Sequence, residues 1–177
     1  MEYARKIKEE AWLLGQTPED ADSISDLGTI QHHLSVWKVN DAKDSAELND
    51  IALALAMSRS KVEEFYMVLI DIDEFNGEYS QTPINLSQEK GSTQYIAMVD
   101  KHINFVVPQL QNQYNLSKYI HGKIDKGKEY YYYYSYDDIL TLFKEAIKAG
   151  KINADDLSQG WKKCFNDEIK PKIKNDK

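Results

Sequence analysis

A run of tyrosines is the most unusual feature of this sequence and one that could take part in molecular recognition. Tyr130 to Tyr134 are consecutive, and Tyr136 follows after one serine. A tyrosine ring stacks on flat groups and packs on apolar surfaces, while its hydroxyl donates and accepts hydrogen bonds. Side chains alternate between the two faces of a strand, so an extended run places Tyr131 and Tyr133 opposite the even-numbered tyrosines.

Three roles are open to this run. Together with Lys123, Lys126 and Lys128, it could form a platform on which the bases of a single-stranded nucleic acid stack. It could instead be a protein-contact surface, because tyrosine is enriched at interfaces. It could also be a half-buried hairpin packed on helices. We expect Tyr131 and Tyr133 to contact a protein partner.

Charge is divided unevenly along the chain. Residues 1–100 include 19 acidic and 8 basic side chains, whereas residues 101–177 include 10 acidic and 14 basic side chains. An acidic surface attracts a basic partner and speeds its association. We therefore expect the N-terminal half to dock a basic protein through carboxylates, and the candidates are Glu19, Asp20, Asp22, Asp26, Asp41, Asp44, Glu47 and Asp50.

The composition favours a protein partner over a nucleic acid. Among the 22 basic residues only Arg5 and Arg59 are arginine, and arginine is the side chain best suited to hold phosphate through two hydrogen bonds. A small acidic chain with one cysteine and without catalytic motifs has the profile of immunity-type or antitoxin-type inhibitors of basic toxins. This likeness is one of type and depends on no motif.

The alternative hypothesis is a small DNA-binding regulator. Residues 49–67 resemble a helix-turn-helix, in which a turn after the first helix leads into a recognition helix. The residues facing the major groove would be Arg59, Ser60 and Lys61. Ala56 stands where the turn favours glycine, and apolar residues spaced by seven from Leu48 to Leu69 predict one unbroken helix instead.

No residue pattern indicates catalysis or metal binding. The sequence contains no GxGxxG, GxxxxGK[ST], GxSxG or HExxH motif. His32 and His33 are adjacent, so on a helix they point about 100° apart. The acidic run that begins at Asp71 has Phe75 where a calcium loop needs an oxygen ligand. We expect no enzyme activity, no catalytic residue, no cofactor and no metal site.

Length and composition predict one domain over residues 1–177. Apolar residues make up 42% of the chain and charged residues 29%, a balance that builds a core and is unlike that of a disordered chain. The first ten residues are charged and do not resemble a secretory signal. The longest uncharged apolar stretch, residues 51–57, is too short to cross a bilayer. We expect a cytoplasmic protein.

The elements that would position these residues have the pattern of amphipathic helices. Apolar residues at spacings of three and four predict helices over residues 2–14, 23–37, 44–75, 92–110 and 135–150, and from 153 onward. Asp44 and either Ser135 or Asp137 are expected N-caps, and Gly150 is an expected helix end. Pro171 is expected to stop the last helix, so that the lysine-rich tail frays from about residue 171.

One β-rich segment interrupts these helices. Tyrosine and isoleucine favour strands and Asp-Lys-Gly-Lys at 125–128 favours a turn, so residues 119–135 predict a β-hairpin. The expected fold is therefore mainly α. It consists of five to seven amphipathic helices in one bundle-like domain, with a single β-hairpin near residues 119–135.

Overall fold

A computed structural model describes residues 1–13, 17, 21–27, 33–79, 84–87, 94–107, 110–127 and 130–175. The strands are β1 (Glu2–Ile7), β2 (His33–Val39), β3 (Phe65–Asp71), β4 (Asn85–Leu86), β5 (His102–Val106) and β6 (Tyr131–Tyr134). The helices are α1 (Glu9–Trp12), α2 (Ala21–Asp26), α3 (Ser45–Met57), α4 (Ile72–Glu78), α5 (Leu110–Lys126), α6 (Tyr136–Lys148), α7 (Gln159–Cys164) and α8 (Lys170–Asn175).

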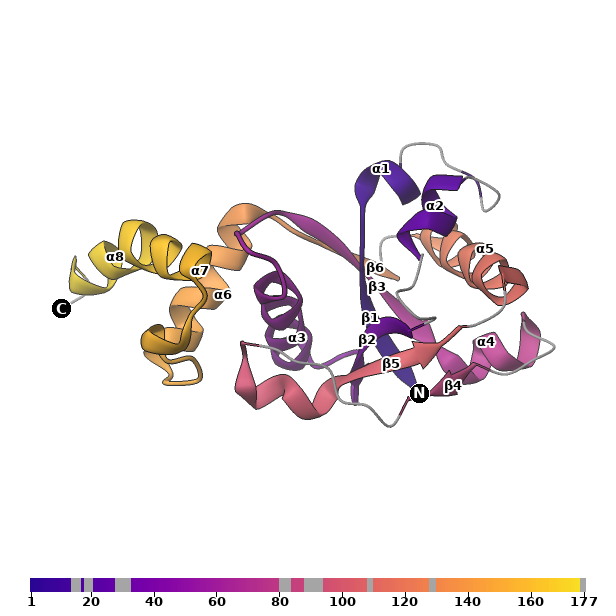
Figure 1. Cartoon of the computed structure of the whole chain (residues 1–177), viewed down its shortest axis with the longest axis horizontal. Helices are drawn as coiled ribbons and strands as arrows, with labels where there is room; N and C mark the ends of the chain where they lie inside the picture. The colour runs from indigo at the N-terminus through magenta and orange to yellow at the C-terminus, as the bar shows by residue number, and fades with distance from the viewer. Residues whose placement is uncertain are drawn as a thin grey trace.

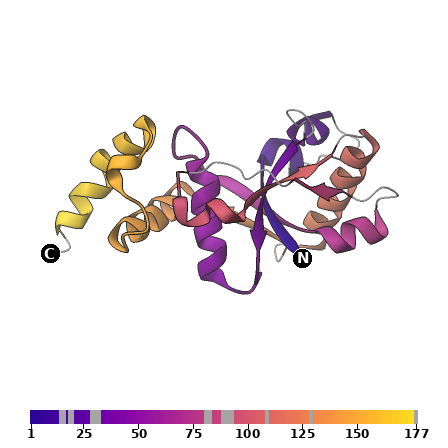
Figure 2. The same ribbon diagram turned by 60° about the horizontal axis from the view of Figure 1, so that its bottom comes forward.

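A sheet divides the molecule into layers. Within the described residues the sheet has six strands, all antiparallel to their neighbours, in the order β4-β5-β2-β1-β3-β6. Figure 1 shows α1, α2, α4 and α5 on one side of it and α3, α6, α7 and α8 on the other. In both Figure 1 and Figure 2 the C-terminal helices lie at the opposite end of the molecule from α4 and α5.

The expected mainly α bundle with a single hairpin is wrong, because the sheet is the centre of the fold. The helices expected over 2–14, 23–37 and 92–110 are replaced largely by β1, β2 and β5. The hairpin expected over 119–135 does not form: its first half belongs to α5, and its second half, β6, pairs with β3 instead.

The spacing of apolar residues explains these errors. Residues four apart share one face of a strand as well as one face of a helix, so Tyr3 and Ile7 suit both. β3 is covered on both sides, and Met67 through Ile70 are all buried. A run that is apolar at every position fits any period. The helix expected over 44–75 therefore merged α3, β3 and part of α4.

Two hydrophobic cores lie on the two faces of the sheet. Successive residues of β1 and β3 contribute to different cores: Ala4 and Met67 pack toward α3, α6 and α7, whereas Tyr3 and Val68 pack toward α1, α2, α4 and α5. On the first side α3 lies against the sheet and α6 packs on α3. The walls on both sides of the edge strand β6 are therefore helices.

Several local predictions are confirmed. The Asp44 carboxylate accepts hydrogen bonds from the backbone N–H groups of Ala46 and Glu47 at the start of α3. Ser135 caps α6 in a capping box with Asp138. Gly150 ends α6 with a φ of 68°, the left-handed conformation that glycine adopts without steric cost.

Pro171 does not stop the last helix. α7 continues through a π turn at Phe165–Ile169 into α8, so the tail expected to fray from about residue 171 begins as a helix. Proline in an α-helix interior lacks an N–H donor and its ring clashes with the carbonyl four residues earlier. The wider π turn just before Pro171 shifts that carbonyl and accommodates the ring.

Candidate functional site

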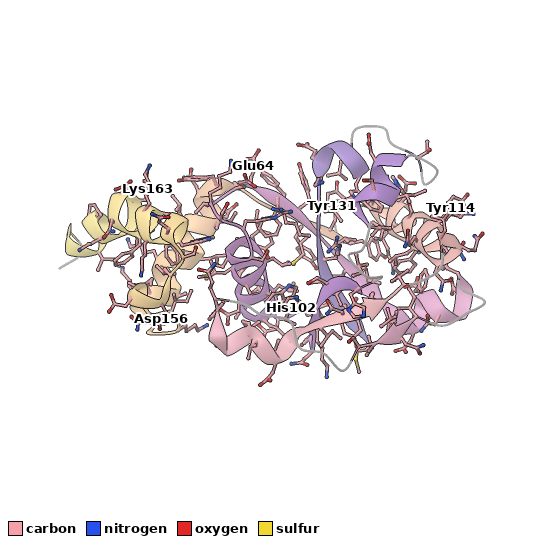
Figure 3. The ribbon with its side chains drawn as sticks, in the orientation of Figure 1. Glu64, His102, Tyr114, Tyr131, Asp156 and Lys163 are labelled. Atoms are coloured by element: carbon pink, nitrogen blue, oxygen red, sulfur yellow. The ribbon has the colours of Figure 1, made fainter. Side chains whose placement is uncertain are left out.

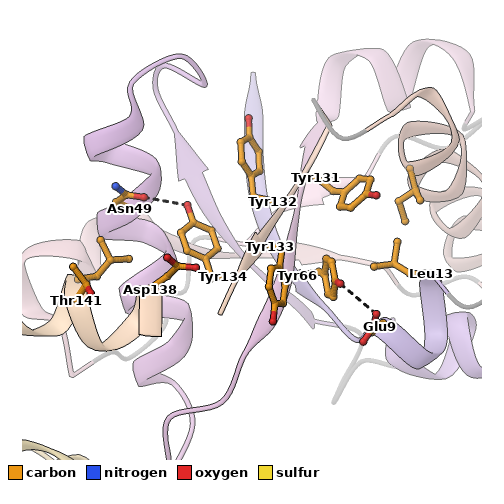
Figure 4. A pocket seen from close by; sticks show the side chains of 12 residues that line it. Glu9, Leu13, Asn49, Tyr66, Tyr131, Tyr132, Tyr133, Tyr134, Asp138 and Thr141 are labelled. Atoms are coloured by element: carbon orange, nitrogen blue, oxygen red, sulfur yellow. Dashed lines mark hydrogen bonds between the residues drawn. The ribbon is translucent and has the colours of Figure 1, made fainter. Parts of the chain in front are cut away.

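A groove of about 870 Å³ runs along β6, the four-residue strand at one edge of the sheet. Both faces of the strand line it, together with residues from the helices on either side. The lining residues are Glu9, Leu13, Asn49, Tyr66, Ile124, Tyr131, Tyr132, Tyr133, Tyr134, Asp138, Thr141 and Leu142. Figure 4 shows Tyr134 beside Asn49 and Asp138, and Tyr66 and Tyr131 toward Leu13 and Glu9.

The predicted alternation of the tyrosines is confirmed for β6. Tyr132 and Tyr134 lie on the face toward α3, and Tyr134 is only 8% exposed. Tyr131 and Tyr133 lie on the other face, where both of their rings contact the ring of Tyr66. Tyr133 is 48% exposed. The strand therefore presents one anchored pair of rings and one accessible pair.

Carboxylates accept hydrogen bonds from the hydroxyls of Tyr133 and of its neighbour Tyr66. Tyr133 Oη donates to Glu64 Oε2 over 2.7 Å, and Tyr66 Oη donates to Glu9 Oε1 over 3.2 Å. The hydrogen bond to Glu64 raises the pKa of Tyr133 to about 12. In Figure 3, Glu64 lies at the upper edge of the view, and Tyr131 lies nearer the middle of the molecule. This tyrosine face is thus both aromatic and acidic.

The groove has an acidic lining. Its described lining residues include the carboxylates of Glu9 and Asp138 and no lysine or arginine. A smaller adjoining pocket of about 300 Å³ shares Glu9 and Tyr66 with it, and there Lys6, Lys8 and Arg59 balance the acidic side chains. The stretch along β6 therefore has carboxylates without a lysine or arginine among its described lining residues.

The acidic residues singled out in the sequence do not gather in the groove. Glu19 and Asp20 lie outside the described residues, and Asp22, Asp41 and Asp44 are exposed on α2 or near the start of α3. The other three are engaged within the fold: Asp26 accepts from the Trp12 indole, Glu47 pairs with Lys101, and Asp50 pairs with Lys151 and accepts from Tyr95.

The acidic side chains at the groove are not among those predicted from the sequence. Glu9 of α1 and Asp138 of α6 line the groove, and Glu64, from the segment before β3, lines the adjoining pocket and accepts from Tyr133. They meet only because β3 pairs with β6. Tyr66 was not predicted as a site residue for the same reason. Assigning residues 65–71 to a strand would have placed the Tyr66 side chain on the opposite face of that strand from Phe65 and Met67.

Replacing Glu47 with glutamine is expected to lower the free energy of unfolding by about 1–2 kcal/mol at pH 7. Burial raises the pKa of Glu47, but Lys101 and the backbone N–H groups of Asp41 and Asn40 outweigh it and lower that pKa below its usual 4.5. A carboxylate with a lowered pKa stabilises the fold fully above its unfolded pKa and loses this effect as pH falls through the folded value.

Urea unfolding at pH 7 and pH 3 measures this difference between wild type and Glu47→Gln. The difference in the free energy of unfolding between wild type and Glu47→Gln is expected to be smaller at pH 3 than at pH 7. Glu78→Gln, an exposed change on α4, is the control and is expected to stay within about 0.5 kcal/mol of wild type at both pH values. An equal gap at the two pH values for Glu47→Gln would contradict the role of the charge.

The helix-turn-helix does not form. α3 ends at Met57, and the expected recognition helix is replaced by a connection that leads into β3. Arg59 accepts a hydrogen bond from the Trp161 indole through its carbonyl, and Lys61 pairs with Glu63. The structure places Arg59, Ser60 and Lys61 in this connection and not on a helix that could enter the major groove.

Other reactive residues lie away from the groove. Ser23 and His121 are within hydrogen-bond distance at 3.0 Å, but both are buried between α2 and α5. Ser35 hydrogen-bonds to His102, whose ring stacks on Trp37. Among the described residues, no three histidine, cysteine or acidic side chains are grouped to hold a metal ion. Both serine–histidine pairs join neighbouring elements of the fold.

No helix in the described part of the chain is long and apolar enough to cross a membrane. The chain matches no family model, no curated protein and no solved structure.

Proposed function

We propose that this chain is a non-enzymatic protein-binding domain that docks a basic partner in the groove along β6. The observation that carries the proposal is the groove itself, lined by five tyrosines and two carboxylates and, among the described residues, by no cationic side chain. Cations bind favourably over tyrosine rings and beside carboxylates. An immunity-type or antitoxin-type inhibitor acting in the cytoplasm would use such a site to hold its target.

The arrangement of the tyrosines supports a protein partner. Tyrosine offers a large contact area and loses little conformational freedom on binding, and it is common among the residues that dominate binding energy. Tyr66 and Tyr133 are already held by Glu9 and Glu64, so their rings are ordered before a partner arrives. Lys123, which could have joined a nucleic-acid platform, has its charge paired with Glu74, although its ammonium also lies 5.2 Å from the ring centroid of Tyr130.

Capture of a partner from a lysate of the native host, after nuclease treatment, tests the proposal. The immobilised wild-type chain is expected to retain a basic protein at low salt and to release it as salt rises, because charged contacts are screened. Replacing Glu9 and Glu64 with glutamine removes two charges from the groove and its rim. Retention of that protein is expected to weaken by about three- to tenfold.

The matched control is Asp22→Asn combined with Asp41→Asn, which removes the same charge from exposed positions outside the groove. It is expected to bind the partner as wild type does. If the control variant lost the partner and the groove variant kept it, the acidic N-terminal residues would carry the binding and the groove would not. Retention of a nucleic acid in place of a basic protein would also overturn the proposal.

A further inference from the structure

Among the described residues, the edge strand β6 contains no lysine and no proline. It has β3 on one side and, among the described residues, no strand on the other. Natural edge strands are commonly protected by lysine, proline, a bulge or extreme shortness. β4 at the opposite edge is only two residues long. β6 lies within five consecutive tyrosines that include no charge and no proline, so it is suited to accept a further strand.

The register identifies the backbone groups that face outward. Leu69 N–H donates to Tyr130 C=O, one step beyond the pair Val68–Tyr131 that ends the register of β3 with β6. Hydrogen-bonded pairs alternate with non-bonded pairs in an antiparallel ladder. Tyr132 and Tyr134 therefore point their N–H and C=O groups at β3. Those of Tyr131 and Tyr133 point away from the sheet, into the groove side.

The groove lies where an added strand would run. Neighbouring strands are about 4.8 Å apart, and the groove is lined from both faces of β6. Alternate side chains of an added strand would meet two different walls. One wall holds Tyr131, Tyr133 and Glu9, with Glu64 bonded to Tyr133. The other wall holds residues of α3 and α6, and these are Asn49, Asp138, Thr141 and Leu142.

We infer that the basic partner docks an extended segment as a seventh strand on β6, with lysine or arginine at every second position. Since this binding takes place in the groove proposed above, the inference depends on that proposed function. The cationic side chains face the wall of tyrosines and glutamates, and the intervening side chains face Thr141 and Leu142. Backbone hydrogen bonds to Tyr131 and Tyr133 supply affinity that does not depend on side chains.

Charge complementarity favours this occupant over a second copy of the chain. If two β6 strands paired edge to edge, each groove would receive a strand of uncharged tyrosines, and the carboxylates of Glu9 and Asp138 in its lining would gain no cationic partner. Burying carboxylates without a cationic partner costs binding energy. A basic extended segment instead places a cation beside Glu9 and Glu64.

Peptide binding measured by fluorescence anisotropy tests the inference. The probe is the labelled heptapeptide Val-Lys-Val-Lys-Val-Lys-Val, and a peptide of the same composition with its lysines in one block is the first control. Two further peptides carry N-methyl groups on all lysine amides or on all valine amides. One of these two is expected to bind about tenfold more weakly than the parent and the other about equally, since only alternate amides face β6.

Two variants of the chain separate ring from backbone. Tyr133→Ala removes the ring and keeps the outward N–H, whereas Tyr133→Pro removes both and leaves the ladder with β3 unchanged. Circular dichroism confirms that each variant folds. The proline variant is expected to bind the alternating peptide about fivefold more weakly than the alanine variant, because one backbone hydrogen bond is lost.

The possible results are distinguishable. If the alternating and block peptides bound equally, and neither N-methylation nor Tyr133→Pro mattered, strand addition would be wrong while a basic ligand in the groove would stand. If none of these peptides bound but Glu9 and Glu64 were still needed for partner capture, strand addition alone would fail. A dimer of the chain that Tyr133→Pro dissociates would identify a second copy as the occupant and overturn the inference.

Discussion

Replacing Trp161 with alanine is expected to lower the free energy of unfolding by about 3–5 kcal/mol, the usual cost of removing a fully buried aromatic ring. Trp161 is 0% exposed, and its ring packs edge-on against Phe143 of α6 at 5.0 Å between centroids. Its indole N–H donates to the carbonyl of Arg59 over 2.9 Å. One side chain thus joins α7, α6 and the connection between α3 and β3.

Urea unfolding followed by circular dichroism measures this loss without relying on tryptophan fluorescence. Trp161→Phe is the matched control, since it keeps most of the packing against Phe143 and deletes the donor to Arg59. It is expected to cost less than the alanine variant, by about 2 kcal/mol. A loss below about 1 kcal/mol for Trp161→Ala would mean that α7 does not pack on α6 as described.

Gly160→Ala is expected to destabilise the fold by about 1–3 kcal/mol, although alanine is the better helix former. A Cβ atom on Gly160 would overlap the backbone carbonyl oxygen of Ser60, and a backbone atom cannot turn aside as a flexible side chain can. α7 would have to move away from the connection that precedes β3. The close approach of the two backbones therefore leaves room only for glycine at position 160.

Gly77→Ala provides the control with the opposite sign. Gly77 is exposed within α4, and an added Cβ there meets no atom within 4 Å. Helix propensity alone then favours alanine by up to about 1 kcal/mol. Thermal unfolding should show a lower midpoint for Gly160→Ala and an equal or higher midpoint for Gly77→Ala. A shift in the same direction for both variants would contradict the close approach at Ser60.

The features of this fold that the sequence predicts correctly are those that depend on neighbouring residues. The caps at Asp44 and Ser135, the helix over α6 and its end at Gly150 are all confirmed. Each depends on hydrogen bonds or dihedral angles within a few residues, so the local sequence contains the whole cause. The alternation of Tyr131 and Tyr133 with their neighbours belongs here too, because the strand period is a property of one segment.

Only the tertiary structure decided which apolar segments became strands and what they enclose. In β1 the apolar spacing suits a helix as well as a strand, and in β3 burial on both faces removes the period altogether. The choice between them comes from pairing with distant segments, such as Phe65 with Tyr134. The pattern of neighbouring residues does not indicate that pairing. The favourable contacts between paired strands form only after the long loop between them has closed.

The groove also depends on the pairing of distant segments. Its tyrosines were evident in the sequence, but Glu9, Glu64 and Asp138 reach them from three separate segments once β6 has joined the sheet. The acidic residues that looked most suited to a partner are instead exposed elsewhere or paired within the fold, as Glu47 is with Lys101. Composition determined that the chain is acidic and rich in tyrosine. The pairing of β3 with β6 decided where those two properties coincide.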